Sequence, residues 1–121
     1  MQRKNTGILG EKFARDFLKK RGYRIIETNY RCPKGEIDIV ARQKDSLVFI
    51  EVRTKTSLEF GTPEESITST KRNRMRATAF YYLQDHTEQP KQWRIDFVGI
   101  ELDNKGKPSR IELIENAVGE E

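Results

Sequence analysis

Hydrophobic residues change their spacing along the chain, from helical repeats of three and four residues to alternation and back. The helical spacing covers residues 6–21 and 68–85, which predicts one helix near the N-terminus and a second in the middle. Alternating or continuous apolar runs predict five strands, at residues 23–30, 36–42, 47–54, 92–102 and 109–114. The predicted order of elements is therefore α-β-β-β-α-β-β.

Both predicted helices carry one apolar face. These faces are formed by Leu9, Phe13, Ala14, Phe17 and Leu18 in the first helix and by Met75, Ala79, Tyr82 and Leu83 in the second. The central strands are apolar on both sides, which indicates a sheet that is covered on both sides. We therefore expect an α/β fold with a sheet flanked by helices, formed by residues 1–121 as a single domain. Residues 58–63 are expected to form a loop, and residues 119–121 are expected to fray.

Two acidic residues interrupt the apolar runs of the second and third strands. Asp38 follows Ile37 in one strand, and Glu51 follows Ile50 in the next. Carboxylates are rarely buried unless something pairs with them. The sequence therefore poses the question of what accompanies these two acids.

Strand alternation predicts where the two acids point. A loop of two residues, Asp45-Ser46, or of four residues would place Asp38 opposite Arg53 and Val40 opposite Glu51. Asp38 and Glu51 are then diagonal neighbours on one face, within reach of a shared ligand. A three-residue loop would break this match. The face opposite to Asp38 is expected to hold the apolar side chains of Ile37, Ile39 and Ala41.

Two interpretations explain the pair of acids. Adjacent carboxylates repel each other and raise one pKa unless a positive charge lies between them. A hard divalent cation with oxygen ligands, usually Mg²⁺, supplies that charge. Alternatively the acids form ion pairs, Asp38 with Arg53 and Glu51 with Lys55, since charged residues are common in strands.

Other charged residues bear on this choice. Glu11 lies at the edge of the first helix's apolar face, either as a third inward acid or as an ordinary first-turn acid favoured by the helix dipole. The second helix begins with hydroxyl residues followed by Lys71, Arg72 and Arg74. This start suits phosphate binding, and it is equally typical of a capped helix with a solvated basic face. The pattern assigns no role to Asp96, a further acid within a strand.

Composition narrows the class of protein. The chain has 121 residues with 23 Lys and Arg against 19 Asp and Glu, a net charge of +4. This balance favours an anionic partner, although it also keeps a small domain soluble. The single Cys32 excludes an internal disulfide, and together with the single His86 it argues against a zinc site. No apolar run is long enough to span a bilayer, so we expect a cytoplasmic protein without a membrane partner.

Several motifs together resemble a known family. Asp38 followed by Glu51-Val52-Arg53 resembles the D…(D/E)-x-K signature of the PD-(D/E)XK nuclease superfamily. The ordered set of motifs spans nearly the whole chain and is similar to the YraN family of predicted endonucleases, which are similar to archaeal Holliday junction resolvases. The matching stretches are Gly10-Glu11 with Ala14, Gly22-Tyr23, Asn29-Tyr30-Arg31, Gly35-Glu36-Ile37-Asp38, Phe49-Ile50-Glu51-Val52-Arg53-Thr54-Lys55, Ser66-Ile67-Thr68 with Lys71, and Arg94-Ile95-Asp96-Phe97-Val98.

The resemblance implies a restriction-endonuclease-like core, in which a mixed five-stranded sheet has a helix on each side. It also implies an Mg²⁺- or Mn²⁺-dependent endodeoxyribonuclease that hydrolyses DNA phosphodiester bonds, with branched DNA such as Holliday junctions as a substrate. Asp38 and Glu51 would bind the metal through their carboxylates and Val52 through its backbone carbonyl. Glu11 would assist from the helix.

The resemblance extends to the basic residues. Arg53 occupies the superfamily's lysine position, and contacts with DNA are expected from Lys55, Lys71, Arg72 and Arg74. An enzyme that cuts a two-fold symmetric junction is normally a dimer, so a homodimer is implied. Arg53 stays protonated and cannot act as a general base. The alternative is therefore a non-catalytic nucleic-acid-binding or protein-interaction module that retains the nuclease fold.

Overall fold

The computed structural model describes residues 3–56, 61–86 and 92–117. Its elements are α1 (Arg3–Lys20), β1 (Arg24–Cys32), β2 (Gly35–Gln43), β3 (Ser46–Thr56), the 3-10 helix η1 (Pro63–Ser66), α2 (Ser69–Asp85), β4 (Gln92–Leu102) and β5 (Pro108–Ile114). The predicted order is confirmed, with η1 added at the end of the predicted loop. Residues 58–60 of that loop and the predicted frayed end, 119–121, lie outside the described residues.

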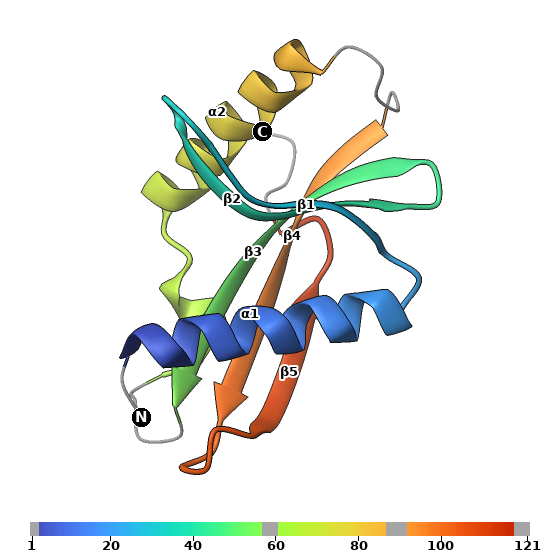
Figure 1. Ribbon diagram of the computed structural model, residues 1–121. Coiled ribbons are helices and arrows are strands. Elements are labelled where there is room, and N and C mark those ends of the chain that lie inside the picture. Colours follow the sequence, from blue (N-terminus) through green and yellow to red (C-terminus); the bar gives the residue numbers. More distant parts are fainter. Residues whose placement is uncertain (1–2, 57–60, 87–91, 118–121) are drawn as a thin grey trace.

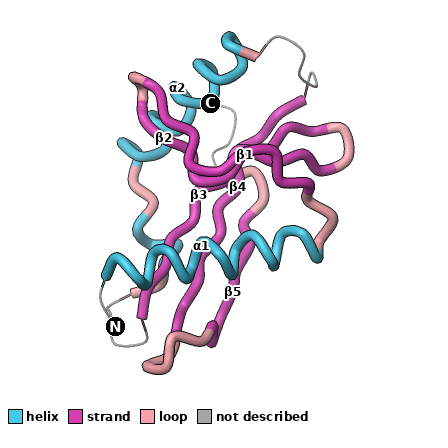
Figure 2. The backbone as a smooth tube through the Cα atoms, in the orientation of Figure 1, coloured by secondary structure: helices cyan, strands magenta, loops and turns pink. Residues whose placement is uncertain are grey.

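The five strands form one mixed sheet in the order β1-β2-β3-β4-β5. Neighbouring strands are antiparallel, except that β3 and β4 run parallel. Parallel neighbours need a long crossover connection, and the segment that contains η1 and α2 provides it. Figure 1 shows α1 crossing β3, β4 and β5, while α2 lies beside the β1–β2 hairpin; Figure 2 gives the same view by secondary structure.

Two hydrophobic clusters fill the two sides of the sheet. The cluster under α1 contains Ala14, Leu18, Tyr23, Ile39, Ala41, Val48, Ile50, Val98, Ile100 and Leu102. The cluster under α2 contains Tyr30, Ile37, Val40, Leu47, Phe49, Met75, Ala79, Tyr82 and Ile95. The apolar faces predicted for both helices, and the α/β fold with helices on both sides, are confirmed. Within the described residues, neither helix combines the length and the apolar character needed to cross a membrane.

The end of the β1–β2 hairpin separates from the rest of the sheet. The β2–β3 ladder ends at the pair Ile39 and Ile50, whereas β1 stays paired with β2 as far as Gly35. Ile37 accordingly packs in the α2 cluster, while Ile39 packs under α1. The predicted common face of Ile37 and Ile39 is therefore wrong, because β2 turns away from β3 between them.

The register between β2 and β3 also differs from the prediction. The hairpin turns one residue earlier than expected, and Val40 lies opposite Phe49 instead of Glu51. The predicted pairing of Asp38 with Arg53 is therefore wrong by two positions. A shift of two positions leaves every side chain on the same face. Extending the ladder by one step makes Asp38 and Glu51 direct neighbours rather than diagonal ones.

Candidate active site

Asp38 and Glu51 meet where β2 separates from β3. The Oδ2 atom of Asp38 accepts a 2.8 Å hydrogen bond from the backbone N–H of Val52, and the Asp38 and Glu51 side chains are hydrogen-bonded to each other. The acids therefore share one face and lie in contact. A strand residue directs its N–H and its C=O to the same edge, so the Val52 carbonyl also faces the edge that β2 leaves.

Glu51 holds a proton because nearby cations only partly offset the effects of its burial and of its neighbour Asp38. Burial, together with the hydrogen bond and repulsion from Asp38, raises the pKa of Glu51 to about 9. Arg53, which the ion-pair interpretation assigned to Asp38, instead lies 3.9 Å from Glu51 Oε2. Arg53 and Lys71 lower the pKa of Glu51 without cancelling the rise. Glu51 therefore keeps its proton beside Asp38 at neutral pH when no cation is bound.

Glu11 approaches the pair from α1. A Cβ on Gly10 would collide with the side chain of Thr54 in β3, so the glycine allows α1 and β3 to approach closely and sets the position of Glu11. The Oε1 atom of Glu11 is buried and has no hydrogen-bond partner among the described residues. Burial, then repulsion from Asp38, raises the pKa of Glu11, although Arg15 Nη1 lies 3.7 Å from the same Oε1 atom and lowers this pKa. Glu11 therefore faces inward, toward the same acids.

Two hollows flank the acid pair. A cavity of about 400 Å³ lies on the α1 side, and Glu11 and Lys55 are among its lining residues. A larger cavity of about 750 Å³ lies between the β1–β2 hairpin and α2, and Glu51 is part of its wall. Asp38, Val52 and Arg53 line both cavities. The site is thus open on two sides, which suits a long substrate better than an enclosed small molecule.

Basic residues of α2 form the wall opposite to the acids. Thr68 caps the helix by accepting a hydrogen bond from the Lys71 N–H, and the Lys71 Nζ donates to the Ser66 carbonyl at 3.2 Å. Burial, then repulsion from Arg53, lowers the pKa of Lys71. Lys71 and Arg74 line the larger cavity, whereas Arg72 is exposed and lines neither of the two.

The structure thus brings together most of the residues that the sequence nominated. Glu11, Asp38, Glu51, Val52, Arg53, Lys55, Lys71 and Arg74 line one or both cavities, and Arg72 does not. Sequence reasoning missed two cations of the larger cavity, Arg31 and Lys34. Arg31 lies near the end of β1 and Lys34 lies in the turn of the β1–β2 hairpin, and no local pattern gave either residue a role at the site.

The donor set fits a hard divalent cation with few protein ligands. Among the described residues, no group of three or more His, Cys, Asp or Glu side chains is arranged to hold a metal ion. The available oxygen donors are the two carboxyls in contact, of Asp38 and Glu51, and the backbone carbonyl of Val52 on the same edge. Mg²⁺ accepts one or two carboxylates and completes its octahedron with water and phosphate oxygens. The residues present therefore fit Mg²⁺ or Mn²⁺.

Asp96 belongs to a separate structural network. It is fully buried and accepts hydrogen bonds from the Tyr23 hydroxyl at 2.9 Å, from Arg94 Nε at 3.0 Å and from the Asn116 N–H at 2.9 Å. These bonds join β4 to the segment after α1 and to the segment after β5. The Gly22-Tyr23 and Arg94–Val98 motifs therefore stabilise the fold, away from the candidate site.

Comparisons with known proteins agree on one family. A family model described as "Uncharacterised protein family UPF0102" matches residues 10–100. A UPF0102 protein of Dehalococcoides mccartyi is 51% identical over 119 residues, which is 98% of this chain and 97% of the relative. UPF0102 proteins of Moorella thermoacetica and Caldicellulosiruptor bescii are 47% and 43% identical, over 97% of this chain and 98% and 99% of theirs. The resemblance found in the sequence is thus confirmed, and the chain belongs to the UPF0102 (YraN) family.

Proposed function

We propose that this protein is a metal-dependent endonuclease that hydrolyses DNA phosphodiester bonds with Mg²⁺ or Mn²⁺. The contact between Asp38 and Glu51 carries the proposal, because two neighbouring carboxyls offer a site for a hard divalent cation. Arg53 and Lys71 line the same cavity and supply positive charge for a phosphate. The two-sided opening of the site supports a polymeric substrate.

The residues of this chain would divide the chemistry among them. Asp38 and Glu51, both ionised, would hold the metal together with the Val52 carbonyl. When bound, the metal ion supplies Lewis acidity and offsets the charge that develops on the phosphate. Arg53 keeps its proton and so binds a phosphate oxygen. Lys71 donates from the opposite wall. The buried Oε1 of Glu11, which accepts no hydrogen bond from the described residues, can accept one from the attacking water.

The resemblance adds finer features to this proposal. Branched DNA such as a Holliday junction is the substrate form that the family suggests, with a homodimer as the assembly and the cytoplasm as the compartment. A panel of junction, flap, duplex and single-stranded DNAs tests the substrate form directly. Sedimentation of the protein with and without junction DNA tests the dimer.

Metal binding and cleavage together test the proposed function. Titration calorimetry with Mn²⁺ should show binding to the wild type and none to Asp38→Asn. The wild type should cut at least one DNA of the panel, and Asp38→Asn should cut none. Asp45→Asn removes an exposed acid in the β2–β3 turn and should change neither result. Failure of the wild type to bind Mn²⁺ or Mg²⁺ would contradict the proposal.

A second candidate function is a non-catalytic nucleic-acid-binding module. Arg53 favours it, because a guanidinium cannot accept the proton that a lysine in this position could exchange. This module would bind the same DNA panel in EDTA and would leave every member intact in Mg²⁺ and in Mn²⁺. Binding without cleavage under both metals would establish this second function in place of the first.

A further inference from the structure

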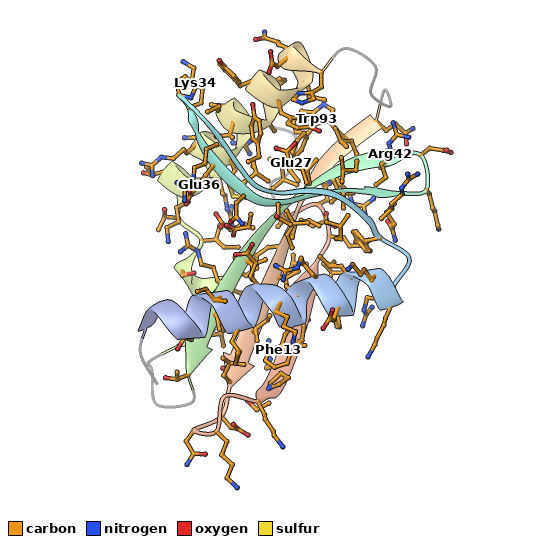
Figure 3. The ribbon with its side chains drawn as sticks, in the orientation of Figure 1. Phe13, Glu27, Lys34, Glu36, Arg42 and Trp93 are labelled. Carbon is orange, nitrogen blue, oxygen red and sulfur yellow. The ribbon has the colours of Figure 1, made fainter. Side chains whose placement is uncertain are left out.

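The end of the β1–β2 hairpin rests against α2 through a glycine. Gly35 has a φ of +148°, and a Cβ placed on it would lie 2.8 Å from Thr78 Oγ1 and 3.0 Å from Arg74 Cγ. The hairpin backbone therefore lies directly over the aliphatic stem of Arg74. Figure 3 shows Lys34 at the free end of this hairpin, beside α2, and Glu36 farther along it. This contact forms one edge of the larger cavity.

Positive charge dominates the wall of that cavity. Its cations are Arg31, Lys34, Arg53, Lys71 and Arg74, and its acids are Glu36, Asp38 and Glu51. Glu36 forms a 3.3 Å ion pair with Arg31, and Glu51 pairs with Arg53.

The hairpin and α2 each contribute one cation that these acids do not neutralise. Lys34 and Arg74 have no acidic side chain within ion-pair distance among the described residues. Arg53 and Arg74 both lower the pKa of Lys71, so cations that repel one another face this cavity. An anion that enters the cavity relieves that repulsion.

Aromatic rings do not contribute to this wall. The residues that line the larger cavity include Met75, Pro33 and Cys32 but no Phe, Tyr or Trp. The exposed ring of Phe80 makes an edge-to-face contact with Trp93, and neither residue lines the cavity. Proteins that hold single strands stack the bases on aromatic side chains. A wall that carries basic side chains but no aromatic rings suits a nucleic acid whose bases are already stacked inside a duplex.

We propose that the cleft between the β1–β2 hairpin and α2 binds the phosphate backbone of double-stranded DNA without reading its bases. Lys34 from the hairpin and Arg74 from α2 contact phosphates adjacent to the one that faces Asp38 and Glu51. This inference rests on the proposed function for the identity of the substrate. It assigns to the hairpin a role that the sequence did not suggest.

Salt-dependent binding tests the inference without cleavage. The probe is a fluorescent duplex of about two helical turns, roughly 20 bp, titrated in EDTA and followed by anisotropy over a range of salt concentrations. Each phosphate contact contributes about 0.9 to the slope of log K against log[salt]. The double variant Lys34→Ala/Arg74→Ala should therefore lower the slope by about two units. Its loss of affinity between 50 and 200 mM salt should be about tenfold smaller than that of the wild type.

The matched control removes the same charge elsewhere. Lys20→Ala/Lys105→Ala replaces two exposed lysines, at the end of α1 and in the β4–β5 turn. It should keep the wild-type slope. A duplex of unrelated sequence should bind with the same affinity, and a single strand of equal length should bind more weakly.

Two groups of outcomes are decisive. An unchanged slope in the Lys34/Arg74 variant, tighter binding of the single strand, or absence of duplex binding would overturn the inference. Because the assay contains no metal, its result is independent of catalysis. A wild type that binds duplex through Lys34 and Arg74 yet cuts no DNA in Mg²⁺ or Mn²⁺ would support the inference and contradict only the nuclease proposal.

Discussion

The backbone N–H of Val52 lies 2.8 Å from the Asp38 carboxylate and bridges β2 and β3 where their ladder ends. This hydrogen bond holds Asp38 against Glu51 although the strands have begun to separate. It also occupies a backbone donor that would otherwise lose its partner at the fork. The fork in the sheet therefore creates the space for a substrate and fixes the acid that faces it.

Glu51 should make the metal-free protein less stable as the pH rises. Its pKa is about 9 in the folded protein against an ordinary value of 4.5, so the folded state retains a proton that the unfolded state releases. The contribution of the neutral carboxyl is fully present below pH 4.5 and is lost as the pH rises toward 9. Glu51→Gln mimics the neutral form, so it should flatten this dependence and raise Tm above that of the wild type at alkaline pH.

Thermal melts in EDTA at several pH values measure this effect. Asp45→Asn, in the exposed β2–β3 turn, serves as the control and should follow the wild-type curve. Saturating Mg²⁺ should reverse the order of the two Tm values, so that the wild type melts above Glu51→Gln, because a ligand that binds only the folded state stabilises it. A Glu51→Gln variant that melts well below the wild type in EDTA would contradict the electrostatic account.

Two substitutions of Asp38 should separate its charge from its hydrogen bond. Asp38→Asn keeps an oxygen that can accept from Val52 and removes the repulsion, so metal-free stability should rise or stay unchanged. Asp38→Ala leaves the Val52 N–H without its acceptor and should cost about 1–3 kcal/mol. Urea unfolding in EDTA measures both. A loss of about 3–5 kcal/mol in Asp38→Asn would instead indicate a buried ion pair.

The sequence predicted the elements and the acid pair well because both depend on local periodicity. The helix faces with Ala14 and Met75 and the strand residues around Phe49 follow simple helical and alternating patterns. The exact β2–β3 register was wrong, since a turn one residue earlier fits the same pattern. The acids remained on one face because the error was an even number of positions.

The features that the sequence did not predict depend on contacts distant in the chain. Ile37 changes sides because β2 bends away from β3, and no residue in its own strand signals the bend. Lys34 and Arg74 come together only because Gly35 rests on α2. The structural role of Asp96 is explained by its hydrogen bond with Tyr23, which lies 73 positions earlier in the chain. Such pairings need the fold before they can be recognised.

Two glycines of α1 should respond in opposite ways to alanine. A Cβ at position 10 would collide with the Thr54 side chain, so Gly10→Ala should cost about 1–3 kcal/mol and displace Glu11 from the acid pair. Gly7 lies in the same helix with nothing within 4 Å of its added Cβ. Gly7→Ala should therefore stabilise the protein by about 0.5–1 kcal/mol. Urea unfolding compares the two, and equal effects would show that the α1–β3 contact is unimportant.

Asp96 should matter for stability and not for chemistry. Asp96→Asn weakens a fully buried partner of Arg94 and should cost about 3–5 kcal/mol. Tyr23→Phe removes the hydrogen bond donated to Asp96 and the one accepted from Arg94, and it should cost about 1.5–3 kcal/mol. DNA cleavage per folded molecule should remain at the wild-type level when both variants are assayed well below their Tm. Loss of cleavage by folded Tyr23→Phe would contradict a purely structural role.

Arg53 should act through its charge and its planar group. It lies 3.9 Å from Glu51 and lines both cavities, so it is placed to bind the phosphate. Arg53→Ala should lose about 2.7–4 kcal/mol of transition-state stabilisation, by analogy with removal of one preorganised donor. Arg53→Lys keeps the charge without the bidentate fork and should lose less. Lys105→Ala, in the distant β4–β5 turn, controls for net charge.

If the protein only binds DNA, Arg53→Ala will instead lower the salt slope of affinity by about one unit. Full cleavage activity in Arg53→Ala would contradict the assigned role.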